Sequence, residues 1–158
     1  MQPQPPASLA LDAAGIPHRV FRHEGEVTSL EQAARERGQS PEQVVRSLLF
    51  RLPGGEYVLV LVAGPVQIPW KALRRSLGQS RVTMATAEEV LAVTGCHVGT
   101  VSPFGLPRPL RVLLDASVLR QHEVSMGSGA PGVGILMYRA DLRRALGEVE
   151  LVNLLADE

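Results

Sequence analysis

At 158 residues the chain has the length of one domain, and its 45% hydrophobic and 20% charged residues are ordinary for a globular protein. Sixteen basic and sixteen acidic side chains cancel, so any binding of nucleic acid must come from a local patch rather than from an overall positive field. No apolar run approaches the roughly 20 residues that cross a bilayer, and the first residues lack the features of a secretory signal. We therefore expect a cytoplasmic protein.

The single cysteine also limits the chemistry. Cys96 has no partner for an internal disulfide, and no Cys/His spacing in the sequence resembles a zinc site. We expect neither a metal nor a cofactor.

Capping residues and glycines mark the helices along the chain. A proline-rich, flexible lead over residues 1–7 precedes Ser8, which we expect to cap a helix that ends at Gly15. In Thr28-Ser29-Leu30-Glu31 a hydroxyl stands three residues before a glutamate, as in a capping box, and this predicts a second helix that ends at Gly38. Further helices or helical turns are expected over 40–42, 68–78, 86–95, 115–119 and 141–146.

Runs of β-branched and large apolar residues predict the strands. The two strongest runs, 44–52 and 57–63, are separated by Pro53-Gly54-Gly55-Glu56 and should form an antiparallel hairpin at the centre of the sheet. Because hairpins alternate irregularly with helices, the sequence favours a mixed sheet within one domain, residues 8–158. Shorter strands are expected over 18–23, 81–84, 110–114, 122–125 and 133–138.

Glycine and proline are concentrated in two loops, 95–107 and 125–134. In the first loop Pro103 and Pro107 fix φ and remove two amide donors, while three glycines permit positive φ or the close approach of another group. The second loop carries four glycines within residues 127–134, between two apolar runs. Two rigid loops of this kind predict a pocket walled by backbone, with N–H groups aimed at a ligand.

No nucleophile motif is present in the sequence. Gly-x-Ser-x-Gly is absent, and Cys96 has only the adjacent His97 as an obvious base, although sequence neighbours rarely face each other. Cys96 is more simply interpreted as a small buried hydrophobic residue. The glycine run 127–134 lacks Gly-Lys-Ser/Thr and stands between two strands, which argues against a nucleotide P-loop.

One cation interrupts the first strand of the predicted hairpin. Arg46 lies within Val44-Val45-Arg46-Ser47-Leu48-Leu49-Phe50, where it is either a solvated side chain at an edge or a cation inside a cleft. The chain strongly favours arginine over lysine, since Lys71 is its single lysine. Arginine at position 46 agrees with this preference.

Three segments together resemble the YbaK family, which includes free-standing relatives of the editing domain of bacterial prolyl-tRNA synthetase. They are 44–49, the passage from Thr94-Gly95 into 99–105, and Gly127-Ser128-Gly129. The most specific part is the Gly-x-x-x-Pro motif formed by Gly99 and Pro103, and the resemblance covers nearly the whole chain. It implies a compact α/β (α+β) domain with a mixed, largely antiparallel, barrel-like sheet surrounded by helices.

The activity that this resemblance implies is hydrolysis, in trans, of an amino acid wrongly esterified to the 3′ end of a tRNA. An aminoacyl ester is already activated, so the enzyme needs to place a water or a neighbouring substrate hydroxyl and to stabilise the oxyanion, without a protein nucleophile. The resemblance implies catalytic roles for Arg46 and for the backbone at Gly99. Substrate-binding roles are expected for Thr28, Val101, Ser102, Pro103, Phe104, Gly127, Ser128 and Gly129.

The implied partner is the acceptor end of a tRNA that carries an aminoacyl ester. An aminoacyl-tRNA synthetase is a further candidate partner, and we expect a monomer or a weak dimer.

Arg46 is a departure from the family pattern, because typical members carry at this position a lysine that contacts the terminal nucleotide. Arginine keeps the charge and can grip phosphate through two hydrogen bonds, but it does not exchange protons near neutral pH. We favour a conservative electrostatic clamp. The alternatives are a catalytically weakened module that binds tRNA or a synthetase, and a hydrolase of other small acyl esters or amides.

Overall fold

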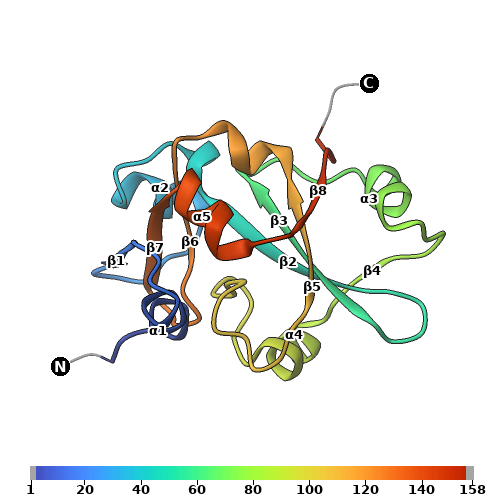
Figure 1. Ribbon diagram of the computed structural model, residues 1–158, viewed down its shortest axis with the longest axis horizontal. Helices are drawn as coiled ribbons and strands as arrows, with labels where there is room; N and C mark the ends of the chain where they lie inside the picture. The colour runs from blue at the N-terminus through green and yellow to red at the C-terminus, as the bar shows by residue number, and fades with distance from the viewer. Residues whose placement is uncertain (1–2, 156–158) are drawn as a thin grey trace.

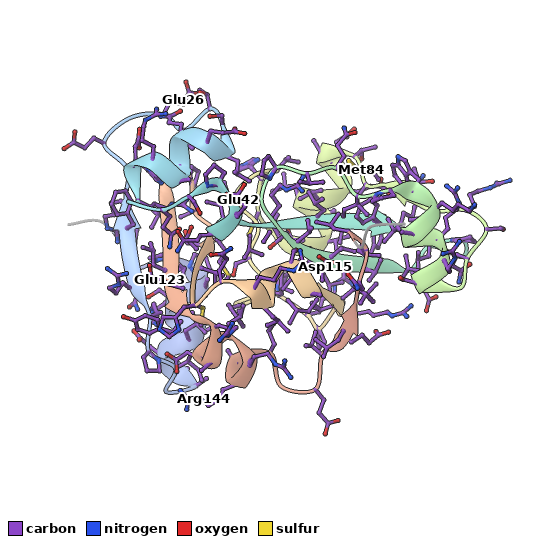
Figure 2. The ribbon with its side chains drawn as sticks, turned by 90° about the horizontal axis from the view of Figure 1, so that it is seen from above. Glu26, Glu42, Met84, Asp115, Glu123 and Arg144 are labelled. Carbon is purple, nitrogen blue, oxygen red and sulfur yellow. The ribbon has the colours of Figure 1, made fainter. Side chains whose placement is uncertain are left out.

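Two β-sheets share one hydrophobic core in the computed structural model, which describes residues 3–155 (Figure 1). The strands are β1 (Arg19–Arg22), β2 (Val45–Arg51), β3 (Tyr57–Ala63), β4 (Thr83–Met84), β5 (Arg111–Asp115), β6 (Glu123–Gly127), β7 (Val133–Tyr138) and β8 (Glu150–Val152). The smaller sheet has the order β1-β7-β6 and the larger sheet the order β4-β2-β3-β5-β8. Glu123 of β6 and Met84 of β4 lie toward opposite ends of the molecule in Figure 2.

The mixed, largely antiparallel pairing is confirmed. Only β5 pairs in parallel, with β3 on one side and β8 on the other, among the strands of residues 3–155. One isolated parallel bridge, from Val44 to Ser125, connects the two sheets. The sheets therefore do not close into a barrel, and in this respect the barrel-like description was too strong.

Helices and short helical turns surround the sheets, as expected. They are α1 (Pro6–Ala13), α2 (Leu30–Glu36), α3 (Trp70–Leu77), α4 (Ala87–Thr94) and α5 (Arg139–Leu146), with the 3-10 turns η1 (Pro41–Gln43) and η2 (Ala116–Arg120). Within the described part of the chain, no helix has the length and apolar character needed to cross a membrane.

The first helix starts earlier than the sequence suggested. α1 begins at Pro6, so Ser8 is not its N-cap. Ser8 is instead buried inside the helix, where its hydroxyl is hydrogen-bonded to His18 Nε2 at 2.7 Å. The flexible lead expected over residues 1–7 thus overlaps α1 by two residues, while its first two residues lie outside the described part of the chain.

The N-cap of α2 lies one residue later than predicted. Ser29, not Thr28, occupies this position, and its hydroxyl accepts a hydrogen bond from the backbone N–H of Gln32 at 3.0 Å. The Gln32 side chain in turn accepts from the N–H of Thr28 at 2.9 Å. The side chain that accepts from the Thr28 N–H is therefore that of Gln32 and not, as expected, that of Glu31.

The β2–β3 hairpin is the centre of the larger sheet, as predicted. Its strands pair along their whole length, and residues 58–62 of β3 are fully buried. In the turn, Gly54 and Gly55 have φ values of +94° and +89°. Glycine adopts this conformation without steric cost, so the turn allows the two strands to pair in register.

Side chains of β2 alternate between two faces of the sheet. Leu49 belongs to the core cluster that includes residues of the smaller sheet and of α4. Phe50 belongs to a second cluster, which contains Leu73 of α3. Ser47 therefore shares a face with Leu49, and Arg46 shares the opposite face with Phe50. This alternation determines which side chains of β2 face the candidate site.

Glu89 ties α4 to the central hairpin. It closes the predicted capping box with Thr86, and its carboxylate also accepts hydrogen bonds from the Tyr57 hydroxyl and from Arg51 Nη1, both at 2.6 Å. These donors, the Thr86 backbone N–H first among them, lower the pKa of Glu89 to about 2.

We expect the stability of the protein to fall as the pH is lowered from about 4.5 toward 2. A carboxyl with a depressed folded-state pKa stabilises the fold above its unfolded-state pKa, and this contribution is lost as the pH falls through the folded-state pKa. Thermal unfolding of the wild type and of Glu89→Gln across this range measures the effect. The difference between the two proteins should shrink toward the acid end, and a difference that does not change with pH would contradict the prediction.

Candidate active site

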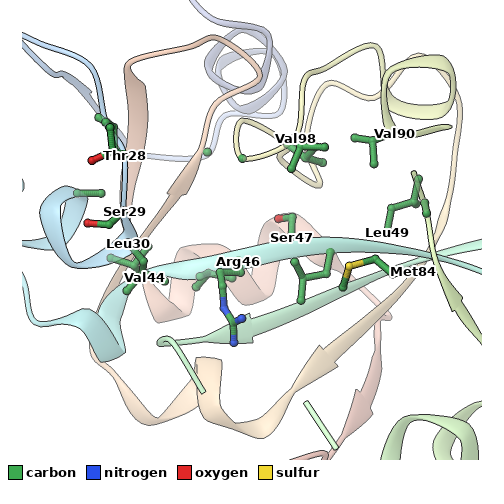
Figure 3. A pocket seen from close by; sticks show the side chains of 18 of the residues that line it. Thr28, Ser29, Leu30, Val44, Arg46, Ser47, Leu49, Met84, Val90 and Val98 are labelled. Atoms are coloured by element: carbon green, nitrogen blue, oxygen red, sulfur yellow. The ribbon is translucent and has the colours of Figure 1, made fainter. Parts of the chain in front are cut away.

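A cavity of about 380 Å³ lies beside β2, between the start of α2 and the first glycine loop (Figure 3). Its lining residues come from 27–37, 44–49, 84–90 and 98–101, and from Gly127 at the end of β6. Residues of both sheets thus form its wall, close to the bridge that joins the sheets.

The two glycine loops contact each other beside this cavity. The N–H of Gly129 donates to the carbonyl oxygen of Thr100 at 2.7 Å. A Cβ added at Gly127 would lie 2.7 Å from the same oxygen and 2.8 Å from the carbonyl oxygen of Val101, so no side chain fits there. The structure therefore brings together the two loops that the sequence singled out, with backbone against backbone.

Gly99 contributes open backbone to the cavity wall. Its φ is +88°, and no atom lies within 4 Å of the position of an added Cβ. The turn is closed by the N–H of Thr100, which donates to the carbonyl oxygen of His97 at 3.0 Å. Gly99 itself is exposed, so a ligand in the cavity can approach its backbone.

Five of the ten predicted site residues line the cavity: Thr28, Arg46, Gly99, Val101 and Gly127. The other five do not line it: Ser102, Pro103, Phe104, Ser128 and Gly129. The hydroxyl of Ser102 accepts from the N–H of Phe104 at 3.1 Å, and that of Ser128 donates to the carbonyl oxygen of Val133 at 2.7 Å. Both serines are buried and hold the shape of their own loops.

Arg46 points away from the glycine loop. In Figure 3 its side chain leaves β2 on the side opposite to Ser47 and Val98. The guanidinium donates to the carbonyl oxygen of Val66, whereas Nε is buried without a hydrogen-bond partner in the described residues. Burial lowers the pKa of Arg46 below the usual arginine value. Arg46, for which the resemblance implies a catalytic role, thus lines the cavity without facing Gly99, because strand alternation directs its side chain to the other face of the sheet.

Ser47 is a cavity residue that the sequence reasoning missed. Its side chain points toward Val98 in Figure 3, and its Oγ is buried with no hydrogen-bond partner among the described residues. The available signal was its position next to Arg46, since neighbours on a strand face opposite sides. A group that enters the cavity can supply the missing partner.

Arg37 is a second lining residue that was missed. Its Nε donates to His23 Nε2 at 3.1 Å and its Nη1 donates to Ser125 Oγ at 2.9 Å. Because His23 Nε2 accepts this bond, the ring carries its proton on Nδ1 and donates it to Glu36 Oε1 at 2.6 Å. Burial lowers the pKa of Arg37 to about 10, which leaves it charged at neutral pH. It has no carboxylate within ion-pair distance in residues 3–155.

The lining therefore offers hydrogen-bond donors but no nucleophile paired with an acidic or basic side chain that could activate it. It includes no Cys, His, Asp, Glu or Lys. Cys96 lies outside the lining, and burial raises the pKa of its thiol. No group of three or more potential metal-ligating side chains of these types occurs in the part of the chain that the structure describes. Such a wall suits the positioning and polarisation of a group that is already reactive.

The sequence profile of the family described as "Aminoacyl-tRNA editing domain" matches residues 24–145, a range that includes all of the cavity lining. The chain belongs to this family. The editing domain is 28% identical to the multifunctional Ser/Thr-tRNA deacylase ProXp-y of Escherichia coli (strain K12), over 90% of this chain and 87% of that protein. It is 35% identical to the uncharacterized protein YwhH of Bacillus subtilis (strain 168), over 78% of each chain.

The similarity of the fold to a solved structure supports the same family. The editing domain matches a crystal structure described as that of a candidate trans-editing enzyme for prolyl-tRNA synthetase, with a TM-score of 0.88, 28% identity and coverage of 99% of both chains. The family expected from the motif segments at 44–49, 99–105 and 127–129 is thus confirmed.

Proposed function

We propose that this editing domain hydrolyses misacylated aminoacyl-tRNA in trans and so contributes to translation fidelity. The observation that carries the proposal is the cavity wall, where the unpartnered Ser47 hydroxyl lies on the face of β2 toward the glycine loop. Family membership and the relationship to a protein named as a tRNA deacylase support the reaction class. An activated ester in this cavity requires a positioned water and stabilisation of negative charge.

In the proposed reaction, the oxygen of a water attacks the carbonyl carbon of the ester. The bond from that carbon to the ribose oxygen breaks, and the water proton passes to the departing oxygen through the neighbouring ribose hydroxyl. The Ser47 hydroxyl donates to the carbonyl oxygen as it gains charge, together with backbone N–H groups beside Gly99. These donors are held in place by the strand and by the paired loops before the substrate arrives.

The aminoacyl side chain is selected by the size of the cavity, which acts as a second sieve. Hydroxyl residues Thr28 and Ser29 lie at one end, and apolar Leu49 and Val90 lie at the other (Figure 3). We assign small amino acids as the substrate class. The name of ProXp-y, which specifies seryl- and threonyl-tRNA for that protein, supports this assignment.

A second candidate function is a catalytically weakened module that binds tRNA or a synthetase. Arg46 favours it, because the residue replaces the lysine typical of the family and its side chain points away from the glycine loop.

A panel of mischarged tRNAs, assayed beside free aminoacyl esters, tests the proposal. We expect multiple turnovers on tRNAs that carry small amino acids and little turnover of the free esters. Binding of aminoacyl-tRNA without turnover would favour the weakened module. Turnover of the free esters alone would indicate a hydrolase of other small acyl compounds.

A further inference from the structure

A second cavity, of about 600 Å³, lies on the opposite face of β2. Arg46, Leu48 and Met84 line both cavities, so the two adjoin along this strand. On this edge β4 pairs only with Phe50 and Arg51, and β6 meets the edge at the start of β2 through the bridge from Val44 to Ser125. No strand of the described residues pairs with the residues in between. A flexible chain can therefore pass around the edge of β2 from one cavity to the other.

The second cavity presents an aromatic surface to solvent. Trp70, at the start of α3, lines it and is 44% exposed. The indole is held edge-to-face against Phe50, with ring centroids 5.7 Å apart and an interplanar angle of 89°. Met84, 49% exposed, lies in the same lining. An exposed ring that is fixed in this way provides a platform on which an unpaired base can stack.

The chain segment that contains Trp70 carries an excess of positive charge. The sequence has no acidic residue between Glu56 and Glu88, although the chain as a whole is neutral. The basic residues of the same segment form no ion pair within residues 3–155: Lys71, Arg74, Arg75 and Arg81. Arg46, which also lines the cavity, has a buried Nε without a partner. A cation in the lining of an aromatic cavity, within a segment of unbalanced positive charge, matches the phosphates and bases of a single strand.

We propose that this second cavity binds an unpaired nucleotide at the 3′ end of the tRNA, with its base against Trp70 and a phosphate at Arg46. The inference rests on the proposed function, since the bound strand then turns around the edge of β2 and delivers its ester to the first cavity. It also explains why Arg46 faces away from the glycine loop: the cation holds the nucleotide and does not take part at the ester.

Trp70 is the only tryptophan of the chain, so the intrinsic tryptophan emission reports on this cavity alone. Titration of the whole protein with the trinucleotide CCA should quench the emission saturably, and binding should weaken as salt is raised. Arg46→Ala should weaken the binding, whereas Arg46→Lys should retain most of it. Arg120→Ala, an exposed arginine outside both linings, is the matched control and should bind as the wild type does.

Deacylation kinetics separate this inference from the proposed function. Trp70→Ala should raise the KM for aminoacyl-tRNA by roughly 5- to 150-fold, the range for loss of one stacked base, with kcat unchanged. Normal deacylation without quenching by CCA would overturn the nucleotide site and leave the proposed function standing. Saturable CCA binding without deacylation of any tRNA would support the site and overturn the function. A change of emission with protein concentration alone would assign the surface to a second copy and overturn the inference.

Discussion

Replacing Ser47 with alanine is expected to impair deacylation without destabilising the folded protein. The Ser47 hydroxyl faces the cavity and has no hydrogen-bond partner among the described residues, so its removal breaks no protein hydrogen bond and should not lower the free energy of unfolding. In the proposed reaction the same hydroxyl donates to the developing oxyanion, and the loss of one such donor lowers kcat by roughly 100-fold. Chemical denaturation and single-turnover deacylation measure the two effects separately.

Ser117→Ala is the matched control for this experiment. Ser117 is also buried, but its hydroxyl accepts a hydrogen bond from the N–H of Ala63 at 3.1 Å, and the residue lies outside the cavity lining. The control should therefore lose about 1 kcal/mol of stability and keep its turnover rate. If Ser47→Ala behaved in the same way as Ser117→Ala, Ser47 would have no role at the site.

Replacing Gly99 with alanine should abolish most of the activity by placing a methyl group where the acyl group binds. Gly99 lines the cavity and the added Cβ meets no protein atom within 4 Å, so the methyl group is expected to compete with the acyl group for this space. The positive φ of +88° also imposes backbone strain of roughly 1–2 kcal/mol on any non-glycine residue. Deacylation rates and apparent affinity for aminoacyl-tRNA, measured below the unfolding transition, distinguish obstruction from instability.

Gly95→Ala supplies the comparison for that strain. Gly95 ends α4 with a φ of +74°, and an added Cβ there also meets no atom within 4 Å. It lies outside the cavity lining. Both variants should lose similar stability, but only Gly99→Ala should lose turnover. Full deacylation by Gly99→Ala with unchanged apparent affinity would remove this loop from the acyl site.

Local signals allowed much of the fold to be predicted. The capping box of Thr86 and Glu89 and the two-glycine turn at 54–55 depend on residues close together in sequence, and both occur as expected. The start of α1 was missed because Ser8 has the chemistry of a cap but is bonded to His18, a partner outside the helix. A propensity for one end of a helix does not exclude a competing long-range contact.

The candidate site was harder to predict, because its walls come from distant segments. Strand alternation places Arg46 and Ser47 on opposite sides of β2, but no local pattern in the sequence shows which side carries the cavity. That choice depends on where the loop with Val98 and Gly99 packs. Likewise, a cation after a helix is normally solvated, and Arg37 is half-buried because its partners His23 and Ser125 come from different elements. The roles of these residues in the reaction stay predictions.

The bridge from Val44 to Ser125 has a thermodynamic consequence. It lies where the two sheets meet, and the neighbouring cavity is lined from both sides of this junction, by Val44 and by Gly127. A compound bound there touches both halves of the protein and is lost when they separate. Its binding free energy therefore adds to the cohesion between the sheets, by an amount that grows with the logarithm of its concentration above the Kd. Occupancy of the cavity is thus linked to the melting temperature, even for a compound that is never hydrolysed.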